Sequence, residues 1–158
     1  MTTYGWLLFL HITGAFCFLG GAVTAAVINL AAQTRERPSE VAALMRMTPV
    51  VVIVVGVGSI MTLVFGLWLV HDVGYGYGDG WIVAALILWA VAAALGGAGG
   101  KRERETRFLA ERLAAEGDAP SAELHSRMRD PATLAMSYGA GVALLVVLVL
   151  MIWKPGAG

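Results

Sequence analysis

Two histidines in apolar surroundings are the residues of this sequence whose type and position could do chemistry. His11 lies inside the apolar run 4–32, and His71 follows the run 48–70 with Asp72 next to it. Neutral imidazole is the commonest metal ligand in proteins, and histidine also holds haem iron. A titratable ring in lipid is costly and by default marks a ligand, cofactor or proton site. These positions therefore predict His11 and His71 as candidate metal or haem ligands.

Small residues share the helix face of His11. At 100° per residue, Ala15, Phe18 and Asn29 fall within about 40° of His11, and Gly14 lies further along the same side. A flat macrocycle needs small neighbours, so Gly14, Ala15 and Phe18 are the predicted walls of a haem pocket. Close packing of another helix would use the same face, with His11 and Asn29 as interhelical hydrogen-bonding groups. The residues leave both interpretations open.

His71 has two interpretations as well. Beside Asp72 it could be an oriented ligand, or it could be half of a solvated pair at the end of a helix. A haem held between His11 and His71 would require the second helix to end deeper than its hydropathy indicates, because His11 lies about two turns inside its own run.

Four apolar runs must position these residues. The 158-residue chain is 58% hydrophobic and 14% charged, and its mean hydropathy is +0.75, outside the range typical of soluble domains. Each run is long enough for a membrane helix of about 20 residues, and open sheet edges do not occur in lipid. The sequence predicts an all-α, polytopic membrane protein, with a single membrane domain (1–158) built as a four-transmembrane-helix bundle. The expected spans are 4–32, 48–70, 80–99 and 132–153.

The distribution of charge predicts the orientation. The first and third connections are rich in arginine, whereas the connection 71–80 contains neither lysine nor arginine. By the positive-inside rule, the two basic connections are cytoplasmic and both termini lie outside. Aromatic residues favour the same outer interface, namely Tyr4, Trp6, Trp68, Tyr75, Tyr77, Trp81 and Trp153. We expect multi-pass insertion in a bacterial cytoplasmic (inner) membrane.

The third connection is predicted to be a cytoplasmic helical extension over about 100–130. Its segment "KRERETRFLAERLAAEG" consists of good helix formers with Phe108, Leu109 and Leu113 on one side, and it ends at Gly117. Its glutamates and arginines are expected on a solvated surface, where they form intrahelical pairs and face anionic headgroups.

Several function classes find no support in the sequence. The chain has no phosphate-binding loop, GxSxG or HExxH motif, and the spans contain no embedded acid for a proton pump. Cys17 is the only cysteine, which excludes an intramolecular disulfide or a CxxC metal motif. The net charge of zero gives no indication of a nucleic-acid partner. Whether the chain is an enzyme stays open.

The segments "YGWLLFLHITGAFCFLGG" and "GLWLVHDVGYGYGDGWIVAALILW" resemble the predicted bacterial integral membrane proteins grouped as domain of unknown function 2269. That group is distantly similar to CopD-type copper-resistance membrane domains and to HemJ-type protoporphyrinogen oxidases. The HemJ-type resemblance implies haem or porphyrin chemistry, and it carries over to His11.

Two functions are therefore expected from the sequence. In the first, the chain binds haem b or a porphyrin for redox chemistry near the outer leaflet, with His11 as axial ligand, and His71 is a second candidate ligand. In the second, it is a cofactor-free accessory or structural subunit that packs within a larger membrane complex. Besides the lipid bilayer, we expect a second copy, giving a homo-oligomer, or a partner membrane subunit.

Overall fold

The computed structural model describes residues 2–156, and within that range it consists of six helices without a strand. Four helices are long and apolar enough to cross a membrane, which confirms the predicted all-α fold with four spans. The helices are α1 (Thr3–Ala32), α2 (Pro38–Met45), α3 (Thr48–Val73), α4 (Gly80–Ala115), α5 (Ala122–Met128) and α6 (Pro131–Trp153).

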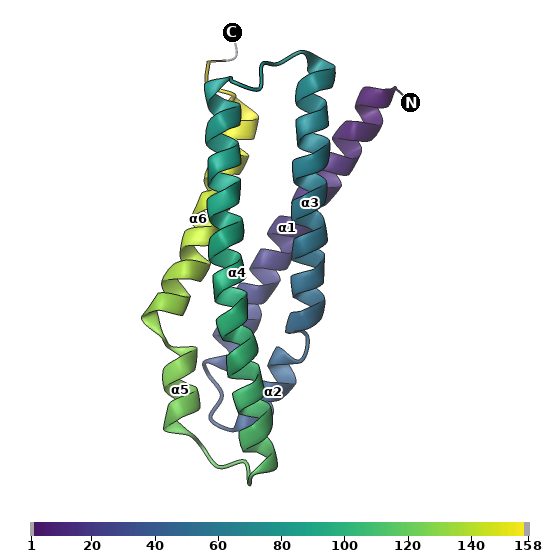
Figure 1. Ribbon diagram of the computed structural model, residues 1–158. Coiled ribbons are helices and arrows are strands. Elements are labelled where there is room, and N and C mark those ends of the chain that lie inside the picture. Colours follow the sequence, from purple (N-terminus) through teal and green to yellow (C-terminus); the bar gives the residue numbers. More distant parts are fainter. Residues whose placement is uncertain (1, 157–158) are drawn as a thin grey trace.

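The long helices run side by side, so that the bundle has two distinct ends (Figure 1). One end holds both described ends of the chain and the α3–α4 connection, and we call it the aromatic end. The other holds α2, α5 and the C-terminal part of α4, and we call it the basic end. Helix α1 packs mainly against α3, and α4 packs mainly against α6. The bundle is therefore built from two helix pairs.

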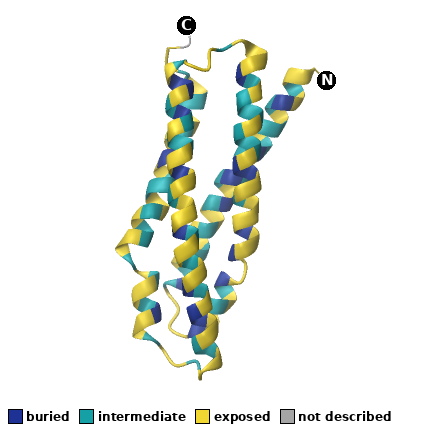
Figure 2. Cartoon of the chain, viewed as in Figure 1, coloured by how far each residue is buried: buried dark blue, intermediate teal, exposed yellow. Residues whose placement is uncertain are grey.

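A few contacts join the two pairs. Phe18 of α1 is buried with Ala92 of α4 and with Ala143 and Leu144 of α6. The indole Nε1 of Trp89 in α4 donates a hydrogen bond of 3.1 Å to the hydroxyl of Ser59 in α3. Because Figure 2 shows exposed residues along most of the long helices, this interior is thin, as expected for helices whose surroundings are lipid rather than water.

Helix α4 continues without a break from the apolar run into the charged segment. Its 36 residues span about 54 Å at 1.5 Å per residue, well beyond the roughly 30 Å hydrocarbon core. The apolar run and the charged segment thus form one helix up to Ala115. The segment was predicted to end at Gly117, and Gly117 takes a φ of +123° two residues after the last residue of α4. After a short connection, α5 starts separately.

The best-buried core lies at the basic end, outside the apolar runs. The largest fully buried side chains are Met45, Leu124, Val41 and Pro38, and all belong to α2 or α5. Val41, Met45 and Leu124 pack with Ala32, Leu109 and Ala110 of α1 and α4. The two short helices, which were not predicted from the sequence, thus fold back onto the extension of α4 and cover its apolar side.

Candidate functional site

His11 makes a direct contact with the neighbouring helix. Its Nδ1 lies 2.9 Å from the backbone carbonyl oxygen of Thr62 in α3. A carbonyl oxygen can only accept, so Nδ1 must carry the proton and donate it. In the neutral ring, Nε2 then carries the free lone pair. The contact fixes the tautomer and orientation of the ring.

Glycine makes room for the imidazole. A Cβ atom added at Gly66 would lie 2.9 Å from both Cε1 and Nδ1 of His11, closer than real Cβ atoms come. The Nδ1–Cε1 edge of the His11 ring therefore lies directly against bare backbone of α3, in space that a side chain at residue 66 would fill.

The α1–α3 contact is close along two further turns. A Cβ added at Gly14 would lie 2.7 Å from the backbone nitrogen of Thr62. One added at Gly58 would lie 2.6 Å from the backbone nitrogen of Phe18 and 2.8 Å from the carbonyl oxygen of Gly14. The glycines of both helices thus allow the two backbones to approach each other, as in other small-residue membrane interfaces.

The residues predicted to bind haem lie in different surroundings in the structure. Gly14 and Phe18 are buried, Ala15 is half-buried, and Gly14 and Phe18 pack against protein atoms. His71 is exposed at the end of α3, five residues beyond Gly66 and thus about 7.5 Å further along the axis. The structure brings His11, Gly14 and Phe18 together at the α1–α3 contact, and it leaves His71 at a different depth.

The two best-defined hollows among residues 2–156 are not lined by His11. The larger is an open apolar groove of about 320 Å³ between α1 and α3, towards the basic end. It is lined by Phe16, Cys17, Gly20, Gly21, Thr24, Val50, Val51 and Val54. Among residues 2–156 no group of three or more histidine, cysteine, aspartate or glutamate side chains could hold a metal ion.

The second hollow lies within a polar cluster at the basic end. Asn29 of α1 donates a hydrogen bond from its amide to Oε1 of Glu103 in α4, at 2.5 Å. A cavity of about 20 Å³ adjoins this pair, and Thr106, Arg127 and Thr133 also line it. That volume holds one water molecule, and the polar lining supplies the partners that a buried water needs. All the elements of the basic end thus meet around a carboxylate.

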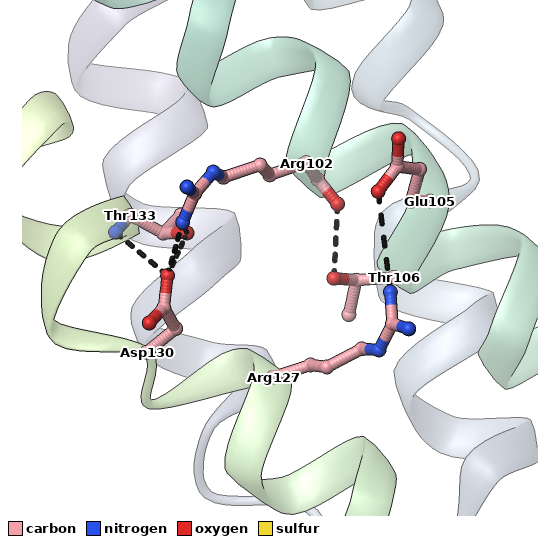
Figure 3. Close-up of polar contacts among 6 residues, drawn as sticks. All are labelled: Arg102, Glu105, Thr106, Arg127, Asp130 and Thr133. Atoms are coloured by element: carbon pink, nitrogen blue, oxygen red, sulfur yellow. Dashed lines mark hydrogen bonds and ion pairs between the residues drawn. The ribbon is translucent and has the colours of Figure 1, made fainter.

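Charged contacts surround this cluster (Figure 3). The guanidinium of Arg102 in α4 pairs with Asp130, which also caps the start of α6 by accepting from the backbone N–H of Thr133 at 3.0 Å. Arg127 of α5 approaches Glu105 of α4 at 4.0 Å. These pairs attach α5 and the start of α6 to α4.

The glutamates of this segment were predicted to lie on a solvated surface, and for Glu103 that prediction was wrong. Its side chain is half-buried, because Gly99, Glu103, Thr106 and Ala110 recur at helical spacing on the face of α4 that turns inward. Phe108, which was expected on the apolar side, is 47% exposed. The spacing of small residues around Glu103 was the signal that could have revealed this face.

A second carboxylate at the basic end starts α2. Asp118, in the α4–α5 connection, accepts from the hydroxyl and from the backbone N–H of Ser39, both at 2.7 Å. These two hydrogen bonds, with a smaller contribution from the charge of Arg37, lower the pKa of the exposed Asp118 carboxyl. Since Arg37 itself makes no side-chain cap, Asp118 supplies the N-terminal cap of α2 from a distant part of the chain.

The chain has four helices long and apolar enough to cross a membrane, with one short connection at the aromatic end and the helical connections at the basic end. This arrangement is that of a multi-pass integral membrane protein. The chain belongs to the family of predicted integral membrane proteins DUF2269, whose model matches residues 6–155. No curated protein matches the chain, and neither does any solved structure.

Proposed function

We propose that the chain is a cofactor-free helical subunit that works by lateral association in the membrane, with a second copy of itself as the partner. The observation that carries the proposal is the use of His11 in packing: its ring is bonded to Thr62 and lies on Gly66. The most unusual residue of the first span is thereby explained as part of the α1–α3 contact.

The groove between α1 and α3 supports a second copy as the partner. Phe16 stands at its edge with 78% of its surface exposed, next to an apolar hollow of about 320 Å³. A twofold axis along the membrane normal brings equal depths of two copies together. Because Phe16 and the groove lie at the same depth, the Phe16 ring of each copy can enter the groove of the other. The surface is then self-complementary, as an isologous interface requires.

Cysteine cross-linking in membranes tests this association. In a Cys17→Ala background, Gly20→Cys places a thiol in the groove, while Gly96→Cys places one on α4; an added Cβ at either glycine meets no atom within 4 Å. Mild oxidation is expected to give a disulfide-linked dimer with Gly20→Cys and not with Gly96→Cys. Equal cross-linking at both positions, or none at Gly20, would contradict the proposal.

Haem ligation by His11 is the second candidate. It is favoured by the Nδ1–H donated to the Thr62 carbonyl, because metal-bound histidines characteristically donate their other ring nitrogen to such an acceptor. His11 Nε2 would be the ligand atom, and a bound haem would supply one-electron redox chemistry. The packing at Gly14 and Gly66 leaves space for the macrocycle only on the outer surface of the α1–α3 pair, where a second copy could cover it.

Absorption spectroscopy separates the two candidates. Protein expressed with added haem and purified in detergent is expected to show no Soret band, oxidised or reduced with dithionite. A near-stoichiometric Soret band that disappears in His11→Ala, and persists in His71→Ala, would establish the haem candidate and refute the cofactor-free proposal.

A further inference from the structure

We propose that an exposed face of α4 at the basic end binds the phosphate headgroups of anionic phospholipids. This headgroup face consists of the exposed side chains of Lys101, Arg104 and Phe108, and it is bordered by Arg107, whose side chain is 18% exposed. The inference does not depend on the proposed function, because it concerns a different helix and a different ligand.

The depth of the face follows from where the neighbouring helices stop. Glu103 contacts Asn29, close to the end of α1 at Ala32. Arg102 pairs with Asp130, immediately before the start of α6. Residues 101–104 of α4 therefore lie at the level where two other apolar helices end. This is the level of the headgroup layer, which adds about 5–7 Å to each side of the hydrocarbon core.

The direction of α4 brings its side chains back toward the membrane. Helical side chains lean toward the N-terminus of their own helix, and the N-terminus of α4 lies at the opposite, aromatic end (Figure 1). Phe108 is seven residues beyond Lys101, about 10 Å along the axis. Long basic side chains from this turn reach the headgroups while their charged tips stay hydrated.

The face combines cations with an exposed ring. The guanidinium carbon of Arg104 lies 5.4 Å from the centre of the Phe108 ring, and that of Arg107 lies 4.8 Å from it. Within residues 2–156, neither Lys101 nor Arg104 has an acidic partner, and Arg107 pairs only with Glu111 at 3.7 Å.

This combination matches the chemistry of a phospholipid headgroup. Planar guanidinium groups bind phosphate through two parallel hydrogen bonds, and an aromatic ring is favoured at the boundary of headgroups and acyl chains. An acidic protein would satisfy the cations equally well, but the depth of the face favours lipid as the partner.

Lipid selectivity of the full chain tests the proposal. The protein is placed in nanodiscs of equal phosphatidylglycerol and phosphatidylcholine, and native mass spectrometry counts the lipids that stay bound. The test variant is Lys101→Gln with Arg104→Gln, and the control is Arg112→Gln. Arg112 is an exposed cation of the same helix, about 12 Å further from the membrane than Arg104.

The wild type is expected to retain phosphatidylglycerol in preference to phosphatidylcholine. In the double variant the ratio of retained phosphatidylglycerol to phosphatidylcholine is expected to fall at least about fivefold, since each basic residue near an anionic surface contributes about that factor. The Arg112 control is expected to keep it, and circular dichroism is expected to show both variants folded. Preference unchanged in the double variant, or equal loss in the control, would refute the proposal. It would also be refuted if the double variant lost an acidic protein partner while its lipid preference persisted.

Discussion

At the scale of single residues, the hydrogen bond between Asn29 and Glu103 is the polar contact that the pattern of apolar runs predicts least. The carboxylate is half-buried where α1 ends, and the amide of Asn29 donates to it. Taking such a group from water is unfavourable unless its hydrogen bonds are replaced. The pair is therefore expected to stabilise the junction between the membrane helices and the basic end.

Replacing Asn29 by leucine is predicted to destabilise the protein by about 1–3 kcal/mol, because a buried acceptor then loses its donor. Glu103→Gln is the matched control: it keeps a carbonyl oxygen that can accept from Asn29, and a smaller effect is expected. The measurement is unfolding in mixed micelles with increasing dodecyl sulfate. A larger loss for Glu103→Gln than for Asn29→Leu would show that the charge of Glu103 matters more than this hydrogen bond.

At the scale of helices, the α1–α3 contact depends on glycines at particular positions. Gly58→Ala is predicted to cost about 1–3 kcal/mol or more, because the added methyl meets backbone atoms of α1 at 2.6 and 2.8 Å. Gly56→Ala, two residues earlier on the same helix, meets no atom within 4 Å and is expected to leave stability unchanged or slightly higher. Unfolding in mixed micelles compares the two variants, and equal effects would mean that the helices are not this close.

The stability of the first turn of α2 is predicted to depend on pH through Asp118. Its pKa is lowered in the folded state by the Ser39 hydrogen bonds, so the stabilisation is present above the ordinary aspartate pKa of about 3.9. It is lost as pH falls through the lowered folded pKa. The protection factors of the α2 amides, which correct for the intrinsic pH dependence of exchange, are expected to fall below about pH 4 in the wild type. In Asp118→Ala they are expected to be low already at neutral pH, and high protection there would contradict the capping role.

At the scale of the whole molecule, the two ends of the bundle are expected on opposite sides of the membrane. In a Cys17→Ala background, Gly78→Cys lies in the α3–α4 connection and Ala119→Cys in the α4–α5 connection, both exposed. An impermeant maleimide is expected to label Gly78→Cys in intact cells and Ala119→Cys only after permeabilisation. The reverse pattern would overturn the orientation inferred from the arginines.

The large features of this fold could be predicted from sequence because they depend on composition along one helix. The expected spans 4–32 and 48–70 correspond to Thr3–Ala32 and Thr48–Val73, since about 20 consecutive apolar residues suffice to define a span. Small helices such as α2 were missed because their stability comes from tertiary contacts, including a cap from Asp118 some 79 residues away in sequence.

The candidate site could likewise be predicted from the sequence only in part. A helical wheel places His11, Gly14 and Asn29 on the inward side of α1, and the structure confirms that this side faces other helices. The identity of their partners could not be predicted, because a wheel shows which way a side chain points and not what it meets. Thr62 offers His11 a backbone carbonyl, and any residue type could have done so.

The central claim is that His11 serves the packing of α1 on α3 through its Nδ1–H. Solid-state NMR of ¹⁵N-histidine-labelled protein in bilayers tests it most directly, because the chain has three histidines and His71→Gln with His125→Gln leaves His11 alone. We expect a protonated Nδ1 in a hydrogen bond and an unprotonated, metal-free Nε2. An unprotonated Nδ1 would contradict the contact with Thr62, and a metal-shifted Nε2 would contradict the cofactor-free function.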